Sequence, residues 1–432
     1  MKLAVVKKQN QSSWRSCQSI TSNLELAYEE FSKALTFSIS DEATIPELDR
    51  LAKEIFENKV THLAWVDHYP HPGAFLEYLK NNFSDELQEN PLKVVIHIFG
   101  DFILHSPQWF KHFSKWNGES LKIQLVAASH RQGRLVDQFL KESGCEIIPF
   151  PVNKSEFSFD QKLRISKRKS LNVEEEEHLF FYSGRLSYQK NIFDIINGFC
   201  QFYKMTNSHC RLLIAGPMDD LGIPYIGKEA LEGTFYFHWE ECMNSLPEGI
   251  RNKITYLGNV TPLELKEYYC AADTYLSMSC HNDEDYGMAP AEALMCGLPC
   301  ILSDWGGFSS FKHYLPNVVT TVPINLSQHR QAPDNLKVTK AMLLAQLHSD
   351  REGLSFEAQR YLGIEDVAKK LQELLESASF NFRGFNGKFI KLASLFRPES
   401  KGPFRSGTGE YSLFYQDIYK VYCDRKEEDD ER

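Results

Sequence analysis

Two glutamates, Glu284 and Glu292, lie in the most informative stretch of the chain, HNDEDYGMAPAEALMCGLPCILSDWGG (281–307). Within it, Pro290 is typical of a helix start and Gly297 of a helix end. Backbone N–H groups at a helix start attract phosphate, whereas carboxylates repel phosphate and accept hydrogen bonds from hydroxyl groups. A ligand with phosphate in its middle and hydroxyl-rich rings at both ends suits this arrangement. The stretch therefore indicates a nucleotide-sugar.

Two cations precede these glutamates by about a hundred residues, in the segment SGRLSYQK (183–190). Gly184 follows an apolar run, and Arg185 and Lys190 stand in the turn toward a helical pattern. Arginine binds phosphate oxygens in bidentate fashion, and lysine supplies a compact positive charge. The two side chains are therefore suited to neutralise the charge that builds on a departing diphosphate.

Short apolar runs alternate with helical stretches along the chain, which predicts parallel α/β layers. The strands expected in the first half lie near 2–6, 61–66, 93–99, 123–127 and 146–148, with helices such as 45–57 and 134–143 between them. Those expected in the second half are 179–183, 211–215, 254–257, 274–278 and 300–303. The second half then forms a Rossmann-like sheet, whose carboxyl edge is the usual place for a ligand.

One helix of the second half has a particularly clear start. Thr261 can cap it, Pro262 suits the first helical position, and Glu264 completes a capping box. From residue 338 onward the pattern is mainly helical, and the chain ends in an aromatic segment and a charged tail.

The chain has 432 residues, of which 42% are hydrophobic and 25% charged, and its formal net charge is −10. These proportions are those of a globular protein of two or three domains. The negative charge argues against nucleic acid as a partner. No apolar run approaches the length of about 18 residues that spans a membrane, and the first residues do not resemble a secretory signal. We therefore expect a cytoplasmic protein with at most peripheral membrane contact.

Three features allow a structural and a functional interpretation. The basic run 162–169 (KLRISKRK), followed by acidic residues at 174–177, is either a solvated linker or a surface for an anionic lipid or acceptor. His68 and His71 indicate either a turn after a strand or a metal site, and Asp283 and Asp285 either a polar loop or a metal-binding DxD. We favour the structural interpretation each time, and we expect the ten cysteines to be free thiols.

Residues from about 180 to 308 resemble the nucleotide-binding domain of retaining glycosyltransferases of family 4, which have the GT-B fold of two facing Rossmann-like domains. The resemblance rests on Glu-x7-Glu within EDYGMAPAEALMCGLPCI (284–301) and on FYSGRLSYQKN (181–191). Four further matches follow in the family's order: LLIAGP (212–217), ITYLGNV (254–260), YYCAAD (268–273) and SDWGG (303–307). A weaker similarity extends to VVIHIFGD (94–101), VAASHRQGRLV (126–136) and IIPFPVN (147–153).

The resemblance implies a role for each matching residue. Arg185 and Lys190 would bind the donor's diphosphate, Glu292 the ribose and Glu284 the transferred sugar. His97 would face that sugar from the first domain, and it completes the expected catalytic set. The other expected donor-binding residues are Gly184 in the turn, Gly258, Asn259 and Val260 beside the base, Tyr286, Gly287, Met288 and Ala289 along the sugar and phosphates, and Gly306 and Gly307 near the phosphates.

The implied fold class is α/β of the GT-B type, with two facing Rossmann-like domains of parallel sheets and a helical C-terminal segment. We expect an acceptor-side domain over 1–152, a linker over 153–177 and a nucleotide-sugar-binding domain over 178–400. A C-terminal helix and charged tail over 401–432 could pack back on the N-terminal domain.

The expected reaction is transfer of a sugar from a UDP-, GDP- or ADP-sugar to a hydroxyl group of a glycan, lipid-linked or small-molecule acceptor, with retention of configuration and without a cofactor or a metal. No side chain stands out as a covalent nucleophile, so substitution on the front face is expected. Three alternatives remain open: a GT-B epimerase or phosphorylase, a catalytically silent scaffold protein, and a dinucleotide-dependent oxidoreductase. The last is disfavoured because no GxGxxG follows a strand.

Overall fold

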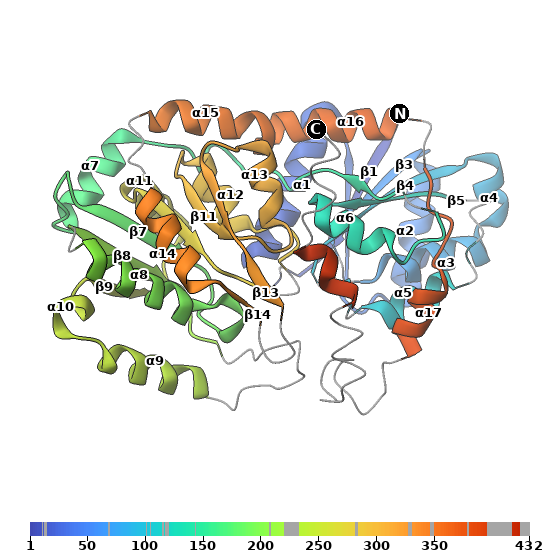
Figure 1. The fold of residues 1–432 in the computed structure, drawn as a ribbon. Helices are drawn as coiled ribbons and strands as arrows, with labels where there is room; N and C mark the ends of the chain where they lie inside the picture. The colour runs from blue at the N-terminus through green and yellow to red at the C-terminus, as the bar shows by residue number, and fades with distance from the viewer. Residues whose placement is uncertain are drawn as a thin grey trace. The chain divides into compact units, whose positions relative to one another are not determined.

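The computed structural model describes residues 1–423 except for 11, 13–14, 68–69, 101, 104, 115, 117–120, 143, 207–208, 220–232, 281–283, 327–330, 346–349, 378–379 and 395–416. The chain divides into two compact units, each built around its own six-stranded sheet (Figure 1). The first unit comprises Met1–Pro151 and Leu362–Pro403, and the second comprises Val152–Tyr361 and Phe404–Arg432.

The sheet of the first unit has the strand order β2-β1-β3-β4-β5-β6, and all neighbouring strands are parallel. Its strands are β1 (Leu3–Lys8), β2 (Leu35–Ile39), β3 (His62–Trp65), β4 (Leu92–Ile98), β5 (Leu121–Ala127) and β6 (Glu146–Ile147). The chain adds β2 on one side of β1 and the other strands on the opposite side, which is the connectivity of a doubly wound α/β sheet. Strand β2 was not predicted; it lies at the sheet edge, where its side chains are mostly exposed or half-buried.

Helices flank this sheet in the first unit. They are α1 (Arg15–Phe31), α2 (Ile45–Glu57), α3 (Pro72–Asn82), α4 (Ser84–Glu89), α5 (Ser106–Phe113), α6 (His130–Asp137), α16 (Ile364–Glu376) and α17 (Gly387–Ser394). The predicted helix 45–57 is confirmed by α2. The prediction of a helix at 134–143 was misplaced, because Ser129 caps α6 by accepting a hydrogen bond from the Gln132 amide and so starts the helix earlier.

The sheet of the second unit has the order β12-β11-β10-β7-β8-β9, again with parallel neighbours. Its strands are β7 (His178–Ser183), β8 (Cys210–Ala215), β9 (Ile254–Gly258), β10 (Thr274–Ser277), β11 (Cys300–Ser303) and β12 (Val319–Val322). Counted from β7, this is the strand order of the Rossmann fold, and the order reverses between β7 and β10. A small antiparallel pair, β13 (Ile324–Leu326) and β14 (Gln331–Pro333), follows it.

The helices of the second unit include the one with the predicted capping box. They are α7 (Gln161–Ser170), η1 (Tyr188–Lys190, 3-10), α8 (Ile192–Thr206), α9 (Thr234–Ser245), α10 (Glu248–Arg251), α11 (Pro262–Ala271), α12 (Met288–Met295), α13 (Phe308–Tyr314), α14 (Asn335–Leu344), α15 (Arg351–Leu362) and η3 (Lys420–Tyr422, 3-10). At the start of α11, the Thr261 hydroxyl accepts from the Glu264 amide and the Glu264 carboxylate accepts from the Thr261 amide. That prediction is confirmed.

The core of the second unit lies where α8 covers β7 and β8. The apolar positions of α8 that recur at helical spacing, among them Ile195, Ile196 and Phe199, are buried there. The Phe180 ring of β7 packs edge-on against Phe199 and Phe202, with ring centroids 6.2 and 5.4 Å apart. Burying a side chain of this size contributes about 1.5–3 kcal/mol, so this cluster holds the strand that carries the turn with Arg185.

The unit boundaries differ from the expected domains. Residues 153–177 are part of the second unit, because α7 packs on α11. Residues 362–403 belong to the first unit, because α16 buries Leu371 and Leu375 and packs on α1, while α17 packs on α5. The described residues of the C-terminal tail, 417–423, pack on Trp305 of the second unit. The remainder of the tail lies outside the described residues.

Candidate functional site

The predicted site residues of the second unit gather at one edge of its sheet. β7 ends at Ser183 and β10 at Ser277, on either side of the point where the strand order reverses. The carboxyl ends of strands at such a point are where open α/β sheets bind ligands. Gly184 and Arg185 follow β7, and Glu284 follows β10, so residues far apart in the sequence share this edge.

Glycine is required in the turn after β7 because two backbone segments touch. Gly184 has a φ of 146° and Gly216, after β8, a φ of 133°. A Cβ atom on Gly216 would lie 1.9 Å from the Gly184 carbonyl oxygen. The Gly184 amide donates to the Ala215 carbonyl oxygen over 3.0 Å. These contacts fix the direction in which the chain leaves β7.

Arg185 forms an ion pair with Asp219, with 2.9 Å between Nη1 and Oδ2. The Tyr182 hydroxyl donates to the Arg185 carbonyl oxygen over 2.7 Å, and the Asp219 amide donates to the Leu186 carbonyl oxygen over 2.9 Å. Asp219 was missed by the sequence analysis, although an acidic residue shortly after β8 lies at the same sheet edge as Arg185. The side chain of Arg185 is 20% exposed, so it is both paired and reachable from solvent.

Lys190 forms an ion pair with Glu284, with 2.5 Å between Nζ and Oε2. The two side chains are 16% and 11% exposed. Asn191 ends the 3-10 turn in the left-handed region, with a φ of 50°, and its side-chain amide donates to the Met278 carbonyl oxygen over 2.9 Å. This bond ties the turn after β7 to the end of β10 and so brings the lysine to the glutamate.

The electrostatics of two buried tyrosines show that the predicted charges act on one region. Burial raises the pKa of Tyr182 above its usual value, the charge of Glu284 raises it further, and Arg185 lowers it. Burial also raises the pKa of Tyr275, and Glu284 is among the charges that add to this increase. Arg185 and Glu284 therefore both lie close enough to Tyr182 for their fields to reach it.

Glu292 is buried on α12 and is tied to β7 through a tyrosine. Its Oε2 accepts a hydrogen bond of 3.3 Å from the Tyr269 hydroxyl, which lies 2.9 Å from the Ser183 hydroxyl. The helix begins at Met288, two residues before the predicted start at Pro290, so Glu292 is its fifth residue. Tyr269 was also missed by the sequence analysis; it precedes β10 in the YYCAAD segment.

The start of α12 is shaped by close packing around Gly287. Gly287 has a φ of 100°, and a Cβ atom on it would lie 2.4 Å from the Phe308 ring. Tyr286 is buried against Phe311, with ring centroids 5.1 Å apart. Met288 is buried and Ala289 half-buried in the first turn, whose amides have no acceptor within the helix itself. Such amides are suited to an anion.

Gly306 and Gly307 press against the loop that carries Glu284. A Cβ atom on Gly306 would lie 2.4 Å from the Glu284 carbonyl oxygen, and one on Gly307 would lie 2.3 Å from that of Asp285. The Gly307 amide donates to the Glu284 carbonyl oxygen over 2.8 Å, and the Gly306 amide to that of Tyr422 over 3.0 Å. Both amides thus donate to carbonyl oxygens of the chain itself. Glycine is required at both positions because a side chain would clash with the loop that carries Glu284.

The segment expected beside the base lies at the end of β9. Gly258 has a φ of 69°, and its carbonyl oxygen accepts a 2.8 Å hydrogen bond from the Gly216 amide. Asn259 is exposed and Val260 half-buried. This segment therefore continues the same sheet edge, next to the turn of Gly216.

His97 belongs to the first unit, whereas the residues above belong to the second. It lies in β4, is 3% exposed, and its Nε2 is 2.7 Å from the Tyr28 hydroxyl. Burial lowers the pKa of His97 to about 3, so the imidazole is neutral at physiological pH. The observed contacts are those of a core histidine.

The histidines and aspartates that the sequence offered as metal ligands are only partly described by the structure. His68 and Asp283 lie outside the described residues. His71 accepts a hydrogen bond from the Gly73 amide at the start of α3, as a turn before a helix would require. Among the described residues, no three histidine, cysteine or acidic side chains are placed to hold a metal ion, and no helix is long and apolar enough to cross a membrane.

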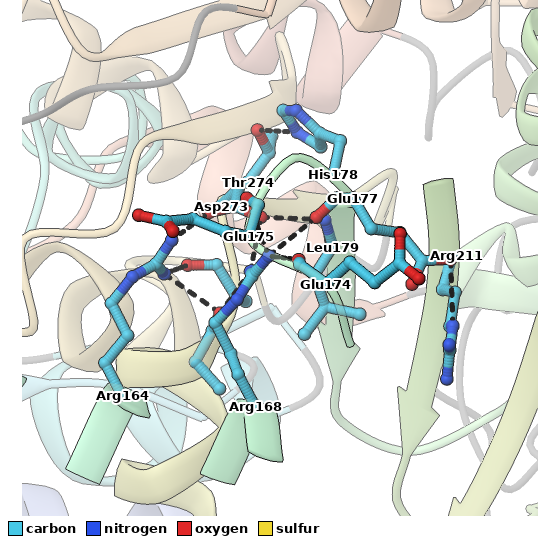
Figure 2. A network of polar contacts seen from close by, with 12 residues as sticks. Arg164, Arg168, Glu174, Glu175, Glu177, His178, Leu179, Arg211, Asp273 and Thr274 are labelled. Carbon is cyan, nitrogen blue, oxygen red and sulfur yellow. Dashed lines mark hydrogen bonds and ion pairs between the residues drawn. The ribbon is translucent and has the colours of Figure 1, made fainter. Parts of the chain in front are cut away.

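The basic run forms helix α7 of the second unit rather than a linker. Figure 2 shows Arg164 and Arg168 of α7 pointing toward Asp273, which lies just before β10. Their guanidinium groups reach its two carboxylate oxygens over 2.6 and 2.9 Å. Burial raises the pKa of Asp273, but the charges of Arg164 and Arg168 lower it below its usual value overall.

The acidic residues after α7, at 174–177, also form structural contacts within the second unit. Glu177 is paired with Arg211 of β8 and with Lys253, at 2.9 and 3.2 Å. Arg168 also donates to the backbone carbonyl oxygens of Glu174 and Glu177. The charge pattern that was interpreted as a solvated linker therefore fastens α7 to the sheet.

Comparison with solved structures defines the fold. HepE of Anabaena, solved with UDP, superposes with a TM-score of 0.61 at 12% identity over 87% of this chain and 99% of that one. A glycosyltransferase from Rickettsia africae gives 0.58 at 14% identity over 87% and 99%, and the sucrose-phosphate synthase of Thermosynechococcus elongatus gives 0.56 at 14% identity over 87% and 98%. The chain has the GT-B fold.

The family model matches within the second unit. Residues 164–314 match the family model described as glycosyl transferases group 1. An uncharacterized glycosyltransferase of Methanocaldococcus jannaschii is 28% identical over 202 residues, which are 44% of this chain and 46% of that protein. The match thus covers less than half the length of that relative. The group 1 domain contains Arg185, Lys190, Glu284 and Glu292, and with the fold it supports a glycosyltransferase.

Proposed function

We propose that the protein transfers a sugar from a nucleotide-sugar to an acceptor hydroxyl, with retention of configuration and without a metal, as the family 4 resemblance implies. The observation that carries the proposal is the Lys190–Glu284 ion pair beside Arg185 at the reversal point of a Rossmann sheet. A cation pair for the diphosphate and an acid for sugar hydroxyls are the groups that this substrate requires. The match to glycosyl transferases group 1 over the same residues supports it.

The donor is proposed to lie along the carboxyl edge of the second sheet. Arg185 and Lys190 bind the diphosphate, together with the amides at the start of α12. Glu284 accepts hydrogen bonds from the sugar, and Glu292 from the ribose. The ion pairs Arg185–Asp219 and Lys190–Glu284 keep both cations in place before the donor arrives, which reduces the entropy lost on binding.

The proposed reaction needs no covalent intermediate. The bond between the anomeric carbon and the diphosphate oxygen breaks, and the acceptor oxygen forms its bond on the same face of the sugar. The acceptor proton passes to an oxygen of the leaving diphosphate. Arg185 and Lys190 stabilise the negative charge that gathers on that group, and such preorganised charge accounts for much of the rate enhancement in many enzymes.

Ligand-induced stabilisation tests the proposal directly. The melting temperature of the full chain is measured with UDP, GDP and ADP and with their common hexose conjugates. One nucleoside diphosphate should raise it clearly, because a ligand at about 100 times its Kd stabilises the folded state by about 2.7 kcal/mol. HepE has been solved with UDP and with UDP-glucose, so UDP is the first compound to test. No shift with any of them would contradict the proposal.

A second measurement separates transfer from the alternatives. For a transferase, nucleoside diphosphate is released at a high rate only when an acceptor is present. Interconversion of one nucleotide-sugar into another without an acceptor would indicate an epimerase. Binding of the donor without release of diphosphate for any acceptor would indicate a silent scaffold.

A further inference from the structure

The described C-terminal residues, 417–423, are docked in the second unit beside the predicted donor site. Ile418, Tyr419 and Tyr422 are each at most 1% exposed. The Tyr419 ring stacks on Trp305 with centroids 6.2 Å apart, and the Tyr422 ring meets Trp305 edge-on at 5.4 Å. Trp305 immediately precedes Gly306 and Gly307. Aromatic burial on this scale fixes the segment in place.

Tyr422 binds the residue after Glu284 and the Gly306–Gly307 turn. Its hydroxyl donates to Oδ1 of Asp285, the neighbour of Glu284, over 2.5 Å. Its carbonyl oxygen accepts from the Gly306 amide over 3.0 Å. A hydrogen bond from a hydroxyl to a buried carboxylate is among the stronger ones in proteins.

The Gly306–Gly307 turn in turn holds the backbone of Glu284. The Gly307 amide donates to the Glu284 carbonyl oxygen over 2.8 Å. A Cβ atom on Gly306 would meet that oxygen at 2.4 Å and the Tyr422 ring at 3.1 Å. The Glu284 backbone is therefore enclosed by the turn on one side and by its own neighbour, which Tyr422 binds, on the other.

We propose that Tyr422 is a positioning residue for Glu284, and that the C-terminal segment thereby sets how the protein recognises the sugar half of a nucleotide-sugar. The inference rests on the proposed function, in which Glu284 binds the transferred sugar. Tyr422 binds the side chain of Asp285, which follows Glu284, and the amide of Gly306, whose neighbour Gly307 binds the Glu284 carbonyl oxygen. The diphosphate is instead bound by Arg185 and Lys190 from the turn after β7. Loss of the Tyr422 hydroxyl should therefore weaken binding of the sugar but not of the diphosphate.

Tyr422→Phe in the full chain tests the inference, because it keeps the ring on Trp305 and removes only the hydroxyl. Kd values are measured by calorimetry with UDP and with UDP-glucose. The Kd for UDP should stay within about twofold, while that for UDP-glucose rises on the order of tenfold, the scale of a hydrogen bond to a charged group. A merely structural role would change the two values together.

Hydrogen exchange gives a readout that does not depend on the ligand. In Tyr422→Phe, the amides of residues 284–287 and 305–307 should exchange faster than in the unaltered chain, because one of their supports is gone. The matched control is Tyr78→Phe, which removes a hydrogen bond from a tyrosine to an aspartate, Asp49, in the first unit. That variant should change neither the exchange in these two segments nor either Kd.

The outcomes distinguish the two proposals. Unchanged exchange at 284–287 in Tyr422→Phe overturns the positioning role. Faster exchange with equal losses for UDP and UDP-glucose, or with no loss, overturns its link to the sugar. If the unaltered chain binds neither UDP nor any other nucleoside diphosphate, the proposed function fails, and the exchange data still decide the positioning role.

Discussion

At the scale of single residues, the candidate site depends on charges that neutralise one another until a ligand arrives. Lys190 and Glu284 are 94 positions apart in the sequence and meet at 2.5 Å. In the proposed reaction the lysine stabilises the leaving diphosphate, so it contributes more to the transition state than to the fold. Substitutions should therefore affect turnover and stability very differently.

Lys190→Ala should lower turnover by a factor on the order of 10²–10³, the usual effect of removing one such stabilising group. The chain should still fold but with a lower melting temperature, because the Glu284 carboxylate, whose side chain is 11% exposed, loses its partner. The measurement is the rate of nucleoside diphosphate release at saturating donor. Lys53→Ala is the control, since it breaks an exposed ion pair with Asp49 in the first unit. Near-normal turnover in Lys190→Ala would remove the lysine from the mechanism.

His97 makes the stability of the first unit depend on pH. Burial lowers the pKa of His97 to about 3, whereas an unfolded histidine titrates near 6.5. As the pH falls below about 6.5, the unfolded chain binds a proton that the folded chain does not, so stability decreases by about 1.4 kcal/mol per pH unit. Urea unfolding between pH 7 and pH 4.5 should show this decrease, and His97→Phe should lessen it. Identical pH dependence in both proteins would contradict the neutral, buried imidazole.

At the scale of elements, α7 is held to the sheet by ionic bonds rather than by an apolar face. Its only buried residue is Arg168, and Ile165 is 60% exposed. Arg164 and Arg168 share Asp273, whose side chain is 3% exposed. Two guanidinium groups on one buried carboxylate compensate for its desolvation, and removal of the carboxylate charge leaves them without compensation.

Asp273→Asn should therefore destabilise the second unit by about 3–5 kcal/mol, the range for breaking a buried ion pair. The matched control is Asp366→Asn, which removes one partner of an exposed pair with Lys369 and should cost less than about 1 kcal/mol. Thermal and urea unfolding measure both. Because the pKa of Asp273 is lowered in the fold, its contribution is present at neutral pH and is lost as the pH falls through that lowered value. Equal effects of the two variants would show that the network is not a main support of α7.

At the scale of the whole molecule, the first unit is completed by residues from the far end of the chain. The Lys93 ammonium donates to the Ser377 carbonyl oxygen, the Phe382 amide to that of Ile123, and α16 packs on α1. A fragment of 1–151 lacks these partners and leaves the apolar face of α1 uncovered. The stability of such a fragment should therefore increase when residues 362–394 are joined to it.

A protein of residues 1–151 alone should unfold without a cooperative transition, whereas the same fragment joined by a flexible linker to 362–394 should unfold cooperatively. Circular dichroism during urea titration provides the measurement. A third fragment, 1–151 joined to 335–361 from the second unit, controls for added chain length. Cooperative unfolding of 1–151 alone, equal to that of the joined fragment, would contradict the assignment of α16 and α17 to the first unit.

The sequence alone was sufficient to predict elements whose signal lies within a few residues, such as buried strands and helix caps. The period of apolar residues located most strands of both sheets, since burial of both faces of a parallel sheet requires nearly continuous apolar runs. The capping box of Thr261 and Glu264 acts within three residues and was predicted correctly. The edge strand β2 was missed because its side chains are only partly buried, which leaves no such run.

The sequence by itself determined the two Rossmann-like halves and the chemical character of Arg185, Lys190, Glu284 and Glu292, because residue type and local period are written in the chain. Only the tertiary structure decided which charges pair, that α16 completes the first unit, and that Tyr422 holds the loop of Glu284. The Lys190–Glu284 pair and the Tyr422–Asp285 hydrogen bond, for example, join positions more than ninety residues apart. Their choice depends on packing geometry, for which a single sequence carries no local pattern.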